Sequence, residues 1–172
     1  MRSIRRRRRS VAASNNDVLR QIDGSWRELQ SALAEVPGDR MEEPGVVGPW
    51  STKDLLGHVT TWEVEMMANV QRVVDGLEMK RYPDVDAFNA DASASKRAMS
   101  VEDLWRKLSE VHGETVRFVS ALSDEMLGRE EVEWRIRIDT FAHYREHAEQ
   151  IRRWLAPEPR PSRAEPDSNH LC

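Results

Sequence analysis

The sequence predicts an all-α fold, a four-helix bundle in which a long crossover joins the second and third helices. Four stretches repeat apolar residues every three or four positions, as the buried face of an α-helix does. The only segment that resembles a strand, 132–138, is short and charged at every other position. The connection over residues 77–99 is long enough to travel the length of a bundle, which leaves the helices on either side of it parallel.

The first two helices are predicted over about residues 16–36 and 51–76. In the first, apolar residues step by three and four positions until Pro37 stops the helix. The second begins at Ser51, an N-cap residue that is followed three positions later by Asp54. Its apolar stripe continues to the end of the predicted range.

The third and fourth helices are predicted over about residues 100–122 and 139–155. Ser100 begins the third with the same capping pattern, and Pro157 stops the fourth. The middle of the crossover, residues 84–90, mixes acidic, amide and aromatic side chains. We expect part of it to fold over a neighbouring region of the bundle.

One domain is expected, over residues 15–155, between a disordered basic leader (1–14) and a disordered proline-rich tail (156–172). Lys and Arg number 26 against 30 Asp and Glu, and six of those arginines, Arg2 and Arg5 to Arg9, lie in the first nine residues. The rest of the chain is therefore acidic. This disfavours a fold that binds nucleic acid through a basic face.

The sequence indicates a cytoplasmic protein. No apolar run approaches the roughly 18 residues that span a bilayer, and no apolar segment of a signal peptide follows the arginines. The only cysteine is Cys172, the last residue. An internal disulfide is thereby excluded, and a cysteine nucleophile in a pocket is disfavoured.

Three histidines carry the clearest chemical signal. His143 and His147 are one helical turn apart, so both imidazoles can point to one place in front of the last helix. His58, on the apolar face of the second helix, is the candidate third ligand. Three histidines with open coordination positions suit catalytic Zn, Ni or Fe(II). The alternative is structural, since such pairs occur by chance on charged helices and a lone core histidine is usually not a ligand.

Longer strings resemble a known family. GPWSTKDLLGHVTTWE, over residues 48–63, resembles the opening of the second helix in the DinB/YfiT-like metalloprotein superfamily. TFAHYREHAEQIRRWL, over 140–155, resembles its closing helix, and residues 84–90 are similar to a loop of the ClbS/DfsB-type four-helix-bundle branch. The resemblance spans about residues 16–155 in the right order.

The resemblance implies a divalent metal on His58, His143 and His147, and an activity among thiol-dependent transferases, isomerases or metal-dependent hydrolases. The mycothiol-dependent isomerases of the superfamily have Glu at the position of His143, which counts against that activity. The ClbS-type branch lacks the paired histidines, so its cyclopropane-opening chemistry does not carry over with the metal.

A general base is expected near the metal, and three residues are candidates for it: Glu65, Asp86 and Asn89. Trp62 and Met66 are candidates for the wall of a substrate pocket, or else ordinary core residues. Glu63 is expected to be a structural partner of an arginine on the last helix. His112 is expected to be solvated and Tyr144 to serve packing.

The leading functional hypothesis is metal-assisted attack on a small electrophilic molecule, by hydrolysis or by transfer of a low-molecular-weight thiol, in detoxification or self-resistance. A metal lowers the pKa of bound water toward about 7, which makes a nucleophile available at neutral pH. One alternative is a non-catalytic protein that sequesters a small hydrophobic molecule, and another is a dimer that the metal only stabilises. The expected partner is a small-molecule substrate, with a homodimer compatible with the sequence and with no membrane or specific nucleic-acid partner.

Overall fold

The structure is a computed structural model that describes residues 14–157. The predictions for the leader and the tail, including those for Arg5 to Arg9 and Cys172, lie outside the described residues.

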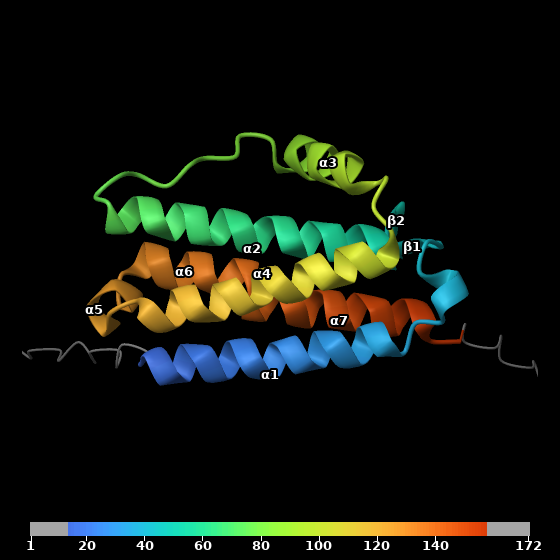
Figure 1. Cartoon of the computed structure of the whole chain (residues 1–172), viewed down its shortest axis with the longest axis horizontal. Coiled ribbons are helices and arrows are strands. Elements are labelled where there is room, and N and C mark those ends of the chain that lie inside the picture. Colours follow the sequence, from blue (N-terminus) through green and yellow to red (C-terminus); the bar gives the residue numbers. More distant parts are fainter. Residues whose placement is uncertain (1–13, 158–172) are drawn as a thin grey trace, which may run out of the picture.

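Helices account for nearly all of the regular structure (Figure 1). The long elements of the bundle are α1 (Asn15–Ala34), α2 (Thr52–Val74), α4 (Val101–Ala121), α6 (Glu130–Asp139) and α7 (Phe141–Leu155). Shorter elements connect them: η1 (Gly38–Arg40), β1 (Pro44–Val47), β2 (Trp50–Ser51), α3 (Val85–Lys96) and α5 (Asp124–Leu127).

The chain forms a bundle of four rods, in which α6 and α7 together make the fourth (Figure 1). The first and fourth rods run in one direction, and α2 and α4 run in the other. After α2 the crossover returns along the outside of that helix before α4 begins, so α2 and α4 are parallel. The predicted bundle with its long crossover is confirmed.

Local signals set the helix starts. Ser14 and Ser51 each accept a hydrogen bond from the backbone N–H three residues on, while the acidic side chain there bonds back, which completes a capping box on α1 and α2. Ser100 caps α4 with its side chain alone: its hydroxyl oxygen accepts from the backbone N–H of Asp103 and its O–H donates to the Asp103 carboxylate. α2 ends at Val74, and Gly76 follows with φ of 77°, a left-handed conformation that glycine adopts without a steric penalty.

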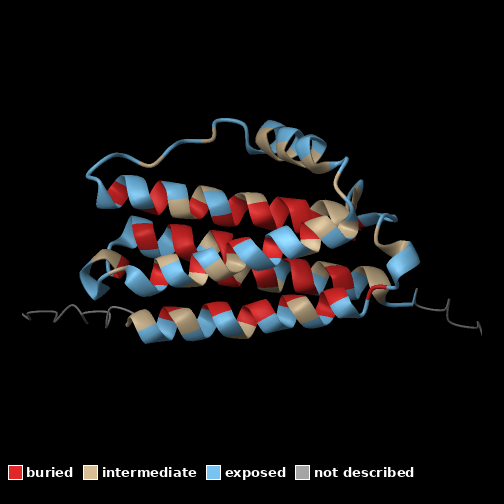
Figure 2. Ribbon diagram, viewed as in Figure 1, coloured by how far each residue is buried: buried red, intermediate tan, exposed pale blue. Residues whose placement is uncertain are grey.

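The core lies where the four rods face one another (Figure 2). α1 packs against α7, and α2 packs against α4 and α6. The buried apolar side chains of these rods form one cluster that includes Ile22, Leu29, Leu56, Leu108, Ile136 and Ile151. By contrast, α3 has no buried residue and lies outside this core.

The crossover is attached to α2 by polar contacts. The indole N–H of Trp62 donates to Asn89 Oδ1 at 2.9 Å, and Lys96 Nζ donates to Thr61 Oγ1 at 2.6 Å. The backbone N–H of Lys80 donates to the side chain of an α2 asparagine at 2.7 Å. The expectation that part of the crossover folds over the bundle agrees with these contacts, which hold it across one side of α2.

The segment 132–138 is helical, since it lies within α6. Its buried residues, Val132, Arg135 and Ile136, recur at a helical spacing against the core. Thr140 separates α6 from α7 with φ of −125° and ψ of −100°, and its hydroxyl donates to the carbonyl of Ile136. The last rod is therefore longer than the predicted fourth helix and has a break within it.

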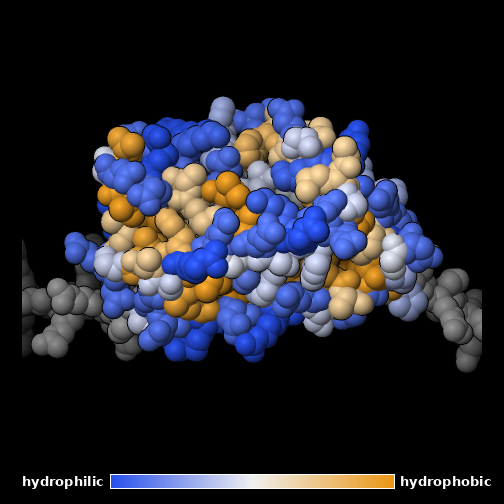
Figure 3. All heavy atoms as spheres, viewed as in Figure 1, coloured by the Kyte–Doolittle hydropathy of each residue, from blue (hydrophilic) through white to orange (hydrophobic). Residues whose placement is uncertain are grey.

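The hairpin formed by β1 and β2 was not predicted. It joins α1 to α2, and Gly48 adopts a φ of 55° in its turn. On the face seen in Figure 3, hydrophilic side chains predominate and apolar side chains gather in separate areas. Within residues 14–157, no helix has the length and apolar character needed to cross a membrane.

Candidate metal centre

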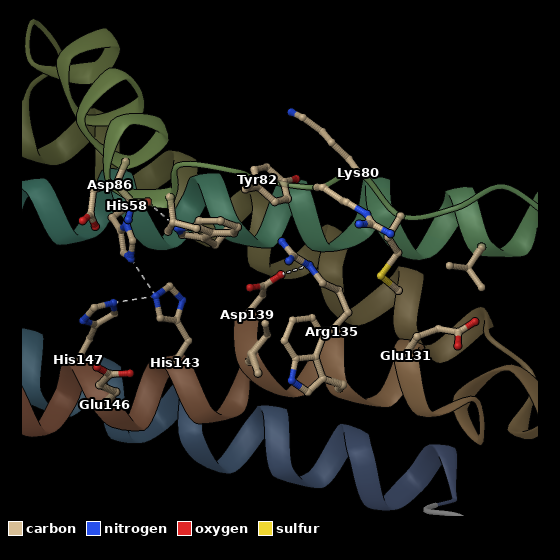
Figure 4. Close-up of a pocket in the computed structure, with 18 of the residues that line it drawn as sticks. His58, Lys80, Tyr82, Asp86, Glu131, Arg135, Asp139, His143, Glu146 and His147 are labelled. Carbon is tan, nitrogen blue, oxygen red and sulfur yellow. Dashed lines mark hydrogen bonds and ion pairs between the residues drawn. The ribbon is translucent and has the colours of Figure 1, made fainter.

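Three histidine rings converge between α2 and α7 (Figure 4). Nε2 of His143 lies 2.9 Å from Nε2 of His58 and 2.8 Å from Nε2 of His147. One ring nitrogen from each residue falls within 4.8 Å of the other two. The structure thus brings together the three histidines that the sequence analysis selected.

Helix geometry explains this convergence. His143 and His147 are one turn apart on α7, so their rings share a face. His58 lies in the second turn of α2, whose capping box at Ser51 fixes where the helix begins. Because α2 packs against the rod formed by α6 and α7, the His58 ring faces the other two across the interface between these neighbouring rods (Figure 4).

All three imidazoles are held in their neutral form. Burial lowers the pKa of His58 to about 3, with a further contribution from the charge of His147. Burial also lowers the pKa of His143 well below its ordinary value, and the other two histidines add to this effect. The pKa of His147 is lowered by burial as well, against the raising effect of Gln150.

The arrangement of the nitrogens fits a cation. Nδ1 of His147 is 2.6 Å from Oε1 of Gln150, and as the donor it leaves Nε2 with a lone pair. His143 Nε2 lies within hydrogen-bond distance of two ring nitrogens and can donate a proton to only one of them. In any neutral arrangement at least one of the two contacts therefore lacks a well-directed hydrogen bond, and like groups repel each other in the cluster, lone pair against lone pair or N–H against N–H. A divalent cation removes that repulsion, and this donor set suits Zn, Ni or Fe(II).

The three histidines lie at one end of a cleft of about 1310 Å³. Its walls come from α2, the crossover with α3, and α6 with α7. Trp62, Asp86 and Asn89, all selected from the sequence, line this cleft. Asn89 accepts the hydrogen bond of the Trp62 indole, so its carbonyl oxygen is engaged in orienting that ring.

Two residues selected from the sequence do not line the cleft, which corrects their predicted positions. Met66 is fully buried in the core, because each step of four residues rotates a helix position by about 40° and two steps take it away from the His58 face. Glu65 shares the His58 face, but Tyr82 of the crossover covers it. The Tyr82 hydroxyl donates to Glu65, and Lys80 Nζ lies 3.7 Å from the same carboxylate.

Glu63 and His112 also differ from expectation. Glu63 is completely buried and accepts a hydrogen bond from the hydroxyl of Tyr144, where an arginine partner was expected. His112 is not solvated, since its ring stacks on Trp26 at 3.9 Å and its Nδ1 lies 3.2 Å from Glu63 Oε1. Burial raises the pKa of Glu63, and the hydrogen bonds from His112 and Tyr144 oppose that rise. Tyr144 is fully buried, as its expected packing role requires.

The sequence analysis missed a buried ion pair in the cleft wall. Nε of Arg135 lies 2.6 Å from a carboxylate oxygen of Asp139, and the guanidinium lies over the ring of Trp62 at 5.1 Å. Burial raises the pKa of Asp139 to about 7, although the charge of Arg135 acts to lower it. Spacing could have revealed the pair, since a residue with polar chemistry recurs every four positions from Arg135 through His147.

The chain matches a family model over most of its length. Residues 21–155 match the model of the DinB superfamily. No curated protein matches.

Three solved structures share the fold. An uncharacterised protein from Escherichia coli UTI89 aligns with a TM-score of 0.67 and 19% identity, covering 85% of this chain and 95% of that one. The colibactin self-resistance protein ClbS, solved in complex with a dsDNA, aligns with a TM-score of 0.70 and 13% identity over 85% and 98% of the two chains. DfsB, a sibling lethal factor precursor, aligns with a TM-score of 0.72 and 12% identity over 83% and 95%. At these identities the likeness concerns the fold alone.

Proposed function

Because the chain belongs to the DinB superfamily, we propose that His58, His143 and His147 hold one divalent metal that serves a reaction on a small electrophilic molecule. The reaction is hydrolysis or the transfer of a low-molecular-weight thiol, in detoxification or self-resistance. The observation that carries this proposal is the meeting of three buried, neutral imidazoles at one end of an open cleft. Zn, Ni and Fe(II) all suit the donor set.

When bound, the metal supplies Lewis acidity, which polarises an electrophile and lowers the pKa of a water or thiol ligand toward neutrality. The protein contributes the fixed, neutral donors and a wall that excludes bulk water from one side. Trp62, held by Asn89, orients the substrate beside the histidines. Asp86 lines the same cleft as the histidines and is the proposed proton acceptor (Figure 4).

The proposed partner is a small molecule rather than a nucleic acid. The acidic charge of the chain outside its first residues supports this choice. ClbS was solved with a dsDNA, which is a property of that protein. All three histidines come from one chain, so the proposed site does not require a second copy. A homodimer is equally compatible with the proposal.

A second candidate function is sequestration without turnover. The cleft volume of about 1310 Å³ exceeds the roughly 300–1,000 Å³ that small-molecule sites usually occupy, which favours a bulky ligand. A sequestering protein keeps its ligand affinity after the metal is removed.

Metal-dependent turnover tests the proposed function. The untagged protein is expected to bind close to one equivalent of Zn, Ni or Fe(II), measured by elemental analysis. An activated ester and an alkyl halide are then incubated with loaded and chelator-treated protein, with and without a low-molecular-weight thiol, and the products are identified by mass spectrometry. The carboxylic acid from the ester, or the alcohol from the halide, indicates hydrolysis. A thioester from the ester, or a thioether from the halide, indicates thiol transfer, and in each case the alcohol or halide leaving group is released. A loaded protein that turns over neither probe contradicts the enzymatic proposal.

Gln150 is expected to be needed for tight metal binding. Its amide N–H₂ lies 3.3 Å from Glu146, which leaves its carbonyl oxygen to accept from Nδ1 of His147 and present Nε2 as the ligand. We expect Gln150→Leu to weaken metal affinity by about 10- to 100-fold, and Gln150→Glu to retain it. Competition with a fluorescent chelator measures both values.

Glu149→Leu is the matched control, since Glu149 is an exposed neighbour on the same helix. Unchanged affinity in Gln150→Leu would show that the His147 tautomer does not depend on this amide.

A further inference from the structure

The cleft continues far beyond the histidines. Its other end is lined by apolar side chains from the end of α2, the first residues of the crossover, and α6: Val73, Leu77, Met79, Trp134 and Ile138. His58 and Val73 line opposite ends of the cleft from a single helix. At a rise of 1.5 Å per residue they are about 22 Å apart along its axis. A small electrophile at the histidines leaves most of this length empty.

Exposed apolar side chains concentrate on this cleft. Among the described residues, five large hydrophobic side chains are exposed, and three of them, Leu77, Val85 and Trp134, line the cleft. Trp134 is 47% exposed. Single exposed apolar residues need no explanation, but a group of them around one concavity is typical of a ligand site. In Figure 3, one of the apolar areas lies towards the end of the molecule at which α2 finishes.

The charged side chains that line the cleft are nearly balanced in sign: four are basic (Lys80, Arg81, Arg129 and Arg135) and five are acidic (Glu78, Asp86, Glu131, Asp139 and Glu146). Arg135 pairs with Asp139 inside the wall, Arg129 pairs with Glu131 at 2.5 Å, and Lys80 lies near Glu65. Opposite charges therefore nearly cancel over the lining of the cleft. An ionic ligand group that binds in the cleft loses hydration and meets no net opposite charge that would compensate for this loss. An uncharged apolar group loses little favourable hydration when it binds there.

We infer that the ligand of this cleft carries an uncharged apolar arm, alkyl or aryl, that lies against Leu77 and Trp134 while its reactive centre lies at the histidines. The position of the reactive centre rests on the proposed function. The arm site does not, because its walls include none of the three histidines. The substrate class is thereby narrowed to elongated molecules with an electrophilic end and a neutral apolar end.

Affinity for a homologous series tests the arm site. The probes are acetyl-, octanoyl- and dodecanoylglycinamide, titrated calorimetrically below their micelle concentrations into the full chain. Each buried methylene raises affinity by up to about fourfold, so dodecanoylglycinamide is expected to bind far more tightly than the acetyl compound. Leu77→Ser and Trp134→Ser are each expected to weaken dodecanoylglycinamide binding by about 10-fold or more and to leave the acetyl compound unchanged.

Val64→Ser is the matched control, because Val64 is exposed to 45% on α2 and does not line the cleft. Its affinities are expected to equal those of the parent chain. Equal affinity for all three probes overturns the inference, and so does a chain-length dependence that survives in both the Leu77 and Trp134 variants.

The same titration with chelator-treated protein separates the two proposals. A chain-length dependence that persists after chelation supports the arm site whatever the metal does. If the metal-loaded protein also turns over neither reactive probe, the enzymatic function is contradicted and the arm site stands. Metal-dependent turnover without chain-length dependence supports the function and contradicts the arm site.

Discussion

Replacing His143 with alanine is expected to abolish tight metal binding while the bundle remains folded. His143 holds the middle position, with its Nε2 within 2.9 Å of both other rings, so its loss leaves two imidazoles that no longer enclose one point. The affinity should fall by more than the roughly 100-fold that loss of a supporting hydrogen bond costs. Competition titration measures the affinity, and circular dichroism measures the helical content.

Thermal unfolding adds an independent measurement. Metal that binds only the folded state raises the melting temperature, and we expect this rise in the parent protein but not in His143→Ala. His112→Ala is the matched control, since His112 is a largely buried histidine on α4 that is hydrogen-bonded to Glu63 and lies outside the cleft lining. The His112→Ala variant should have a lower melting temperature than the parent protein and should still show the rise in melting temperature on metal addition. Parent-like affinity in His143→Ala would remove this residue from the proposed ligand set.

Breaking the Arg135–Asp139 pair is expected to destabilise the fold by about 3–5 kcal/mol. The two side chains are only 6% and 5% exposed, so removal of either partner leaves a charge without compensation in the cleft wall. We expect this cost in Arg135→Met and in Asp139→Asn, and a smaller one in the double variant Arg135→Met/Asp139→Leu, in which neither charge remains. Urea unfolding gives all three free energies.

The two single variants should differ in their pH dependence. Burial already raises the pKa of Asp139 to about 7, and loss of Arg135 removes the influence that lowers it. Between the unfolded value of about 3.8 and the raised folded value, the folded state binds more protons, so Arg135→Met becomes more stable as the pH falls from 8 toward 5. The guanidinium of Arg135 cannot lose its proton, so the cost of Asp139→Asn gains no such relief. An equal cost for Arg135→Met at both ends of this pH range contradicts the assignment.

Features governed by neighbours in sequence were predictable. The helix starts at Ser51 and Ser100 follow from local capping, and the face of each helix follows from its apolar period. The meeting of the histidines needed two further facts: the spacing of His143 and His147, and the presence of His58 on the apolar face of another helix. Both can be read from the sequence, because a bundle places apolar faces opposite one another.

Features decided by tertiary contacts were not predictable. Alternating charges made 132–138 resemble a strand, yet Arg135 and Asp139 form a pair within α6 that is buried because α6 packs against α2, a contact that the local pattern does not reveal. Glu63 bonds a tyrosine and a histidine because it faces α4 and α7, which its spacing from His58 did not reveal. Tyr82 covers Glu65 because of the path that the crossover takes.

The order of the rods has a consequence for synthesis of the protein. His58 precedes His143 by 85 residues, and both α4 and α6 must be made before the second and third rings exist. A chain still emerging from the ribosome therefore has a single imidazole at this position and cannot enclose an ion. On the proposed ligand assignment, an ion can therefore be enclosed only after α7 has been made and has packed beside α2, so metal binding would follow synthesis of the bundle and could not guide its earlier steps.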